Sequence, residues 1–288
     1  MKNKVERSAY LIIDGEAKSV AATEKLLTDQ GQVYLAMIFE NESYLIVDQT
    51  GKPVEYCPTE DTYVDAIGRS TIFTAMAEKT SCFSEENDLL EKALEWNRTK
   101  KGKAYLLDCW VGLPAKRFAS YKKWRTPSGY LCGTYAATVL LAYYQDFRDE
   151  LSLPEEIRKK GSQIDEPLSS ELKKMIQPLG LPTIPLQVSG GLSRFLKKTG
   201  NPFSARNTII GSWQRATKRI HQGKPVMVGI LKILGSPYGN HWVTAYAYYE
   251  SAYYESASGE HFYKVHDNWG DYQRIIPASW GNGTVSLP

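Results

Sequence analysis

Short apolar runs separated by polar turns mark the first part of the chain. Residues 33–39, 44–47 and 53–56 are mainly apolar, and the segments between them consist of charged and turn-forming residues. This pattern predicts a meander of short strands joined by tight turns. Apolar residues recur at helical spacing over 85–100, which predicts a helix there, and another helix is expected over 20–28.

The pattern changes after a polar, basic segment at 98–103. This segment has no periodicity, so we interpret it as a linker or surface turn between a smaller β-rich N-terminal domain, 1–100, and a larger domain, 101–288. In the larger domain the apolar periodicity predicts helices first and strands last, which is typical of an α+β fold. The expected helices are 132–145, 169–178, 192–199 and 211–222, and the expected strands are 104–110, 226–231, 242–249 and 261–266.

Net charge and hydropathy narrow the range of partners. The 288 residues carry a net charge of +3, which gives no reason to expect nucleic acid or an anionic membrane as the partner. No stretch approaches a membrane span. The apolar run before Asp14 has only about five residues, too short for a signal-peptide core, so the sequence reads as soluble and cytoplasmic. A secreted protein whose leader had been removed would look the same, and the sequence does not indicate an oligomeric state.

Cysteine and histidine spacing argues against metal and cofactor sites. The four cysteines contain no C-x-x-C pair, and the four histidines form no H-E-x-x-H motif. We therefore expect no metal and no cofactor. Four cysteines in a chain of this length also do not make a disulfide framework.

Cys132 is the first candidate for chemistry. It follows a Ser128-Gly129 turn and stands where an apolar helix begins. The positive end of the helix dipole is expected to lower the pKa of such a thiol and to favour the nucleophilic thiolate. A buried core cysteine is the alternative, and it suits Cys57, Cys82 and Cys109, which lack a glycine-flanked helix start.

His241 is the second candidate. It follows Gly239-Asn240 and opens an alternating strand, where an ordinary strand-end histidine is the alternative interpretation. A Cys–His pair needs a third group that orients the imidazole, and Asp267 or Asn268, at the end of the next strand, can supply it. We expect the Cys132 sulfur and a His241 ring nitrogen to lie within about 4 Å.

Strand alternation favours Asp267 over Asn268. Successive side chains of a strand point to opposite faces, so only one of the two can face His241. The face with Tyr263 and Val265 is more apolar than the face with Lys264, and Asp267 belongs to the apolar face. A bulge at the strand end would exchange the two faces and would select Asn268 instead.

These motifs, taken together, resemble the papain-like cysteine peptidase superfamily, and most of all the bacterial C39-like and streptopain-like peptidases. The resemblance covers about residues 104–288. The matching segments are Trp124, Cys132-Gly133-Thr134-Tyr135-Ala136, Tyr143-Tyr144, Gly223-Lys224-Pro225-Val226, Asn240-His241-Trp242-Val243 and Asp267-Asn268-Trp269-Gly270. The resemblance implies a helix bearing the cysteine packed on an antiparallel sheet bearing the histidine and Asp/Asn, with Trp269 shielding the contact between His241 and its acceptor.

The sequence departs from the family at the oxyanion hole. These peptidases carry a glutamine before the cysteine, whereas there is none between Gly102 and Cys132. The backbone N–H of Cys132 can supply one hydrogen bond, and the second must come from another group. Our candidates for this second donor are the following residues: Tyr121, Trp124, Thr126 and Ser128.

The resemblance implies a peptidase that acts on peptide or protein substrates through a Cys132–His241–Asp267 triad and a thioester acyl-enzyme. Two alternatives stay open: an acyltransferase or amidase with the same residues, and a catalytically inactive binding module. Streptopain-like enzymes carry a β-rich propeptide, so residues 1–100 are either a removable propeptide or a permanent accessory domain.

Overall fold

The structure, a computed structural model, describes residues 3–4, 9–28, 31–59, 73–75, 83–100, 105–127, 129–148, 150–210, 212–251 and 260–288. Contacts divide the chain into two units. Unit 1 comprises residues 1–116 and 249–260, and unit 2 comprises 117–248 and 261–288. The predicted domain boundary after residue 100 stays a prediction.

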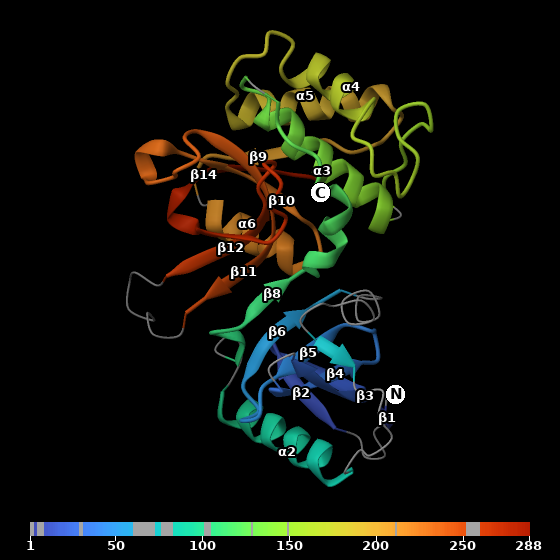
Figure 1. Ribbon diagram of the computed structural model, residues 1–288, viewed down its shortest axis with the longest axis vertical. Helices are drawn as coiled ribbons and strands as arrows, with labels where there is room; N and C mark the ends of the chain where they lie inside the picture. Colours follow the sequence, from blue (N-terminus) through green and yellow to red (C-terminus); the bar gives the residue numbers. More distant parts are fainter. Residues whose placement is uncertain are drawn as a thin grey trace. The chain divides into compact units, whose positions relative to one another are not determined.

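The sheet of unit 1 is mostly antiparallel and runs in the order β1-β3-β4-β5-β6-β8 (Figure 1). The predicted meander is confirmed, because β4, β5 and β6 pair in sequence order with antiparallel registers. The strands are β1 (Asn3–Lys4), β2 (Tyr10–Ile13), β3 (Glu16–Thr28), β4 (Val33–Phe39), β5 (Tyr44–Val47), β6 (Pro53–Cys57), β7 (Phe73–Ala75) and β8 (Trp110–Gly112). Only β6 and β8 pair in parallel among the strand pairs of this unit that we describe.

Two predictions for this unit are wrong. Residues 20–28 form part of β3 instead of a helix, because they pair with β4 along almost their whole length. Sheet pairing here overrides the helical propensity of the segment. The strand expected at 104–110 is confined to β8, which begins only at Trp110. The chain before it turns at Asp108, whose φ is +59° and whose N–H donates to the carbonyl of Glu250.

The helix predicted over 85–100 is confirmed as α2 (Phe83–Thr99), which packs on β2, β3 and β4. Asn97 ties it to the edge of the sheet. The Asn97 side chain accepts a hydrogen bond from the N–H of Ile12 at 2.8 Å and donates one to the carbonyl of Ile12 at 2.9 Å.

The turn between β5 and β6 approaches α2 at Gly51. Gly51 has a φ of +82°, and a Cβ added there would lie 2.4 Å from a backbone carbon of Lys92. The side chain of Asp48 holds the turn by accepting the N–H groups of Thr50 and Lys52. Glycine is therefore required at this position both by its backbone conformation and by the close approach of the helix.

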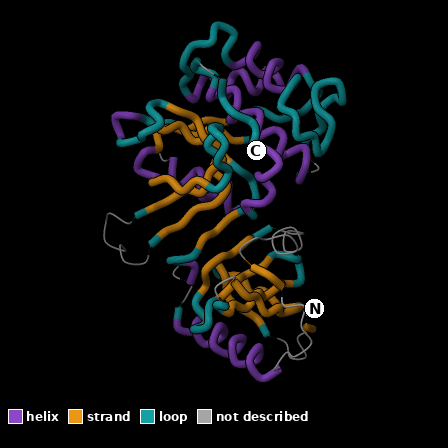
Figure 2. Tube along the Cα trace, in the orientation of Figure 1, coloured by secondary structure: helices purple, strands orange, loops and turns teal. Residues whose placement is uncertain are grey.

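Unit 2 is an antiparallel sheet with helices on it, in the strand order β13-β12-β11-β10-β14-β9. Figure 2 distinguishes its helices from its strands by colour. The strands are β9 (Arg206–Thr208), β10 (Val226–Ile230), β11 (His241–Glu250), β12 (His261–His266), β13 (Arg274–Pro277) and β14 (Gly281–Ser286). The helices are α3 (Cys132–Phe147), α4 (Leu168–Ile176), α5 (Pro185–Lys198) and α6 (Ser212–His221). The predicted helices are confirmed, although α5 begins seven residues before the predicted 192–199.

The central strands of unit 2 are covered on both faces. Val226, Val228 and Ile230 of β10 pack in one core cluster with α6. On the other face of the sheet, the hydroxyl of Thr244 in the adjacent strand β11 donates to the carbonyl of Ala136 in α3. All of β10 is buried, as expected for a strand between two helical layers.

The chain is therefore a mixed α+β protein with mostly antiparallel sheet, in agreement with the coarse prediction. None of the helices in the part of the chain that we describe combines the length and the apolar character that crossing a bilayer requires.

Gly51→Ala should destabilise the protein far more than Gly31→Ala. Gly31 also has a positive φ, of +76°, but an added Cβ there meets nothing within 4 Å. The difference between the two variants therefore isolates the clash with α2. We expect Gly51→Ala to lower the free energy of unfolding by about 1–3 kcal/mol more than Gly31→Ala does. Urea unfolding monitored by circular dichroism measures it. Equal effects of the two substitutions would contradict the close packing of Gly51 on α2.

Candidate active site

Cys132 is the first residue of α3, and the start of this helix is held by a side chain from another element. Leu131, which precedes the helix, provides no side-chain cap. Instead, the Gln177 side-chain oxygen accepts the N–H of Thr134 at 2.9 Å. The Gln177 amide nitrogen donates to the carbonyls of Tyr130 and Leu181. Gln177 thus replaces the missing N-cap of α3 and holds the loop that leads to Cys132 in place.

Glycine at position 133 allows this close packing. A Cβ added to Gly133 would lie 2.7 Å from the hydroxyl oxygen of Thr183 and 3.4 Å from the side-chain oxygen of Gln177. A larger residue at this position would therefore force the Thr183 side chain to move.

Burial raises the pKa of the Cys132 thiol above its ordinary value. The backbone N–H groups of Trp242, Gly133 and Cys132 itself favour the thiolate, but they do not offset the burial. The expectation that the helix start would lower this pKa is wrong, because desolvation outweighs the helix-end N–H groups.

His241 opens β11, and its imidazole has a defined tautomer. Nε2 lies 2.7 Å from the backbone carbonyl oxygen of Asp267. A carbonyl only accepts, so Nε2 carries the proton and Nδ1 carries the lone pair that a base requires. Burial lowers the pKa of His241, while the hydrogen bond and the charge of Asp267 act in the opposite direction.

Aromatic rings pack against the imidazole. The Trp269 ring centroid lies 4.9 Å from that of His241, at an interplanar angle of 46°, which confirms the predicted contact. Tyr238 stacks on His241 at 5.7 Å with the ring planes 10° apart, and it also contacts Trp269. This packing buries His241, which is only 5% exposed, and it restricts rotation of the ring.

Trp242 brings the two candidates into one neighbourhood. Its backbone N–H interacts with the Cys132 sulfur, and it directly follows His241 in β11. No hydrogen bond joins Sγ of Cys132 to the His241 ring among the contacts of these two residues, so the expected separation of about 4 Å stays a prediction.

The Asp267 side chain does not hydrogen-bond to His241. Its carboxylate is buried and accepts the N–H groups of Trp269 at 2.8 Å and Asp271 at 3.0 Å, and the Tyr238 hydroxyl at 3.4 Å. Asp267 therefore contributes its main-chain carbonyl to the imidazole, and its carboxylate holds the two aromatic residues that pack on the ring. Its assignment as a catalytic residue stays a prediction.

Strand alternation does not apply to Asp267 and Asn268, because β12 ends at His266. Asn268 has a φ of +59° and is fully buried. Its side-chain amide donates to the main-chain carbonyl of Trp242 at 2.9 Å. The main-chain carbonyl of Asn268 accepts the N–H of Thr126 at 2.8 Å. Asn268 therefore links the loop after β12 to β11 and to the segment that precedes Cys132.

Two of the four oxyanion candidates have side-chain donors that are already engaged. The Trp124 indole donates to the carbonyl of Gln163 at 2.7 Å, and the Tyr121 hydroxyl donates to Asp146 at 2.6 Å. Ser128 lies outside the described residues. The Thr126 hydroxyl is buried and has no hydrogen-bond partner in the part of the chain that we describe.

Cys132 is partly exposed, whereas Cys57 and Cys109 are fully buried in unit 1. Cys82 lies outside the described residues. Sequence reasoning did not identify Gln177, Tyr238 or Thr183. Of these, only Tyr238 carried a signal, as an aromatic residue three positions before His241.

No family model matches this chain, and no curated protein is significantly similar to it in sequence.

The pH dependence of alkylation tests the raised pKa of Cys132. Because burial disfavours the thiolate, the rate of modification by iodoacetamide should still be rising at pH 9.0, the ordinary thiol value. Peptide mapping separates Cys132 from the buried cysteines. A rate that reaches a plateau near neutral pH would indicate a thiolate–imidazolium pair at rest and would contradict this prediction.

Trp269→Ala should raise the pKa of His241 toward its ordinary value of 6.5, because burial is what lowers it. Trp269 is 49% exposed, so its removal should leave the fold intact. NMR titration of the four histidines measures the change, with His241→Gln used for assignment. Trp213→Ala is the matched control, since Trp213 stacks on His261. An unchanged His241 pKa would mean that Trp269 does not shield the ring.

Proposed function

We propose that unit 2 is a papain-like cysteine peptidase with Cys132 as nucleophile and His241 as base. The observation that carries the proposal is the packing of Thr183 between the start of α3 and the start of β11: its hydroxyl lies against Gly133, and its carbonyl accepts the indole N–H of Trp242 at 3.3 Å. It brings the helix start and the strand start together, although the two residues are far apart in the sequence. The strand order and the covering of β10 and β11 by α3 are consistent with a papain-like arrangement.

The pKa directions of the two groups indicate how the reaction begins. A thiol with a raised pKa and an imidazole with a lowered pKa are both neutral at rest. Nδ1 of His241 then takes the thiol proton as the sulfur attacks the substrate carbonyl, in the manner of general-base catalysis. The imidazolium that forms is stabilised by the Asp267 main-chain carbonyl, which accepts a hydrogen bond from Nε2–H.

The remaining steps use the same groups. The tetrahedral intermediate places its oxyanion near the N–H of Cys132, with the Thr126 hydroxyl as our choice for the second donor. His241 gives its proton to the leaving amine, and the C–N bond breaks to leave a thioester on Cys132. His241 then deprotonates a water molecule that attacks the thioester, which releases the carboxylic acid and restores the thiol.

Hydrolysis of a mixture of tagged peptides by the full chain tests the proposal. Cys132→Ala and His241→Gln should each reduce turnover by roughly 10⁴-fold or more. A peptidyl electrophile should label the wild type at Cys132. Cys57→Ala is the control, since Cys57 lies in unit 1, and it should retain both turnover and labelling.

Other outcomes favour the alternatives. Labelling that persists in Cys132→Ala would contradict the choice of nucleophile. Transfer of the acyl group to added amines in preference to water would indicate an acyltransferase or amidase. A folded wild type that neither turns over peptides nor reacts with the electrophile would indicate an inactive binding module.

A further inference from the structure

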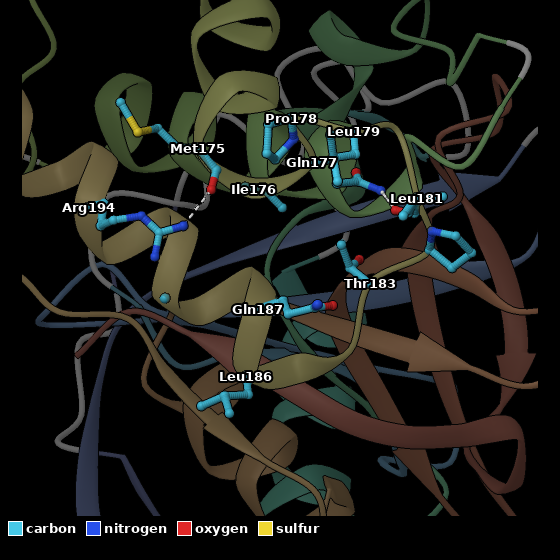
Figure 3. A pocket seen from close by; sticks show the side chains of 12 residues that line it. Met175, Ile176, Gln177, Pro178, Leu179, Leu181, Thr183, Leu186, Gln187 and Arg194 are labelled. Atoms are coloured by element: carbon cyan, nitrogen blue, oxygen red, sulfur yellow. Dashed lines mark hydrogen bonds between the residues drawn. The ribbon is translucent and has the colours of Figure 1, made fainter.

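Cys132 and His241 are held in place by different groups. Gln177 and Thr183 support the start of α3, and both line a pocket between the end of α4 and the first turns of α5 (Figure 3). None of the hydrogen bonds and ring contacts that His241 makes with described residues involves the lining of this pocket. The imidazole is therefore supported by the loop before β11 and by the elements that this loop contacts.

Tyr238 of this loop contacts both the imidazole and the residue that fixes its tautomer. The Tyr238 ring stacks on His241 with the ring planes 10° apart. Its hydroxyl donates to a carboxylate oxygen of Asp267 at 3.4 Å, and the main-chain carbonyl of Asp267 accepts Nε2–H of His241. Tyr238 is thus linked to the imidazole twice, directly through its ring and indirectly through its hydroxyl.

Arg274 of β13 fixes the position of the Tyr238 hydroxyl. Nε of Arg274 donates to this oxygen at 2.6 Å, a short and charge-assisted hydrogen bond. The guanidinium carbon also lies 5.7 Å from the centroid of the Tyr238 ring. Because an arginine can only donate, the hydroxyl proton stays available for the Asp267 carboxylate, which accepts it. The hydrogen bonds therefore run in one direction, from Arg274 through Tyr238 to Asp267.

The Tyr238 phenol keeps its proton in this arrangement. Burial raises the pKa of Tyr238 above its ordinary value of 10.0, while the hydrogen bond from Arg274 acts in the opposite direction. The charged groups nearby are Asp267, which acts on His241, Tyr238 and Arg274, and Asp271, which acts on Arg274. Arg274 is exposed, so its removal should leave no unpaired charge in the core.

We propose that Arg274 and Tyr238 act as one positioning unit, which holds the imidazole of His241 in the orientation that a base requires. Nε2 makes one hydrogen bond, to the Asp267 carbonyl, and one bond by itself does not fix the plane of the ring. A Tyr238 ring that Arg274 holds in a parallel plane restricts this movement while His241 accepts and returns protons. The catalytic consequence rests on the proposed function, whereas the effect on the imidazole does not require catalysis.

Three substitutions separate the hydrogen bond from the charge. Tyr238→Phe keeps the ring and removes the hydroxyl. Arg274→Met removes the donor, whereas Arg274→Gln loses the same charge but places an amide nitrogen where Nε stood, so it can still donate to Tyr238. If the two residues act as one unit, Tyr238→Phe and Arg274→Met each loosen the Tyr238 ring, and combining them adds nothing further.

The matched controls change the same residue types elsewhere in unit 2. Tyr248→Phe alters a partly buried tyrosine of β11 whose hydroxyl lies 3.3 Å from Nδ1 of His221. Arg206→Met alters an exposed arginine of β9, at the opposite edge of the sheet from β13. Circular dichroism verifies that every variant folds.

NMR titration of His241 in Cys132→Ala protein tests the unit without turnover. Burial lowers the pKa of His241, so a looser Tyr238 ring that admits water should raise this pKa toward its ordinary value of 6.5. We expect the rise in Tyr238→Phe and in Arg274→Met, and a rise of no greater size in the double variant. Arg274→Gln should show a clearly smaller rise than Arg274→Met, and the two controls should show none.

Turnover of peptides by protein that retains Cys132 tests the catalytic consequence. Tyr238→Phe and Arg274→Met should each lower kcat roughly 5- to 10-fold, as expected for the loss of one hydrogen bond. KM should not change, because a positioning residue does not contact the substrate. The double variant should be no slower than the slower single variant, and Arg274→Gln should recover most of the rate.

Failure of this proposal is distinguishable from failure of the proposed function. An unchanged His241 pKa in Tyr238→Phe, additive shifts in the double variant, or equal shifts in Arg274→Met and Arg274→Gln overturn the unit whatever the turnover. Non-additive pKa shifts in a chain that hydrolyses no peptide support the unit and overturn the peptidase. Turnover that changes only in KM, or not at all, keeps the peptidase and overturns the positioning role.

Discussion

The site of unit 2 depends on one buried side chain, that of Gln177. The first N–H groups of a helix have no partner within the helix, and at the start of α3 no residue of the preceding loop supplies one. Gln177 accepts the Thr134 N–H and donates to two carbonyls, those of Tyr130 and Leu181. Through these bonds a single amide fixes the loop before Cys132 and the wall of the neighbouring pocket.

A second constraint holds the imidazole. The turn after β12 is organised by the Asp267 carboxylate, which accepts the N–H groups of Trp269 and Asp271. As a result the main-chain carbonyl of Asp267 points to His241, and Trp269 packs on its ring. A carboxylate that organises its own loop can orient a histidine without touching it, and the charge still favours the imidazolium at short range.

Much of the fold follows from local pattern. The meander over β4, β5 and β6 and the helices α2, α3, α4 and α6 were predicted because their apolar residues repeat with the period of the element. Residues 20–28 of β3 were expected to be helical from their sequence, and pairing with neighbouring strands, above all β4, decides their conformation. The directions of the Asp267 and Asn268 side chains did not follow strand alternation, because β12 ends at His266 and hydrogen bonds between Asp267 and Asp271 then form a turn.

For the candidate site, the sequence alone determined which residues stand at a helix start and at a strand start, because glycines and apolar periodicity mark those ends locally. The resemblance of its motifs to those of papain-like peptidases implied that Trp269 lies beside His241, as it does. Only the tertiary structure decided that Gln177 caps α3, that a main-chain carbonyl fixes the tautomer of His241, and that burial raises the pKa of Cys132. These features depend on contacts between residues that are distant along the chain and on the exclusion of water. Neither dependence produces a periodic pattern in the sequence from which it could be predicted.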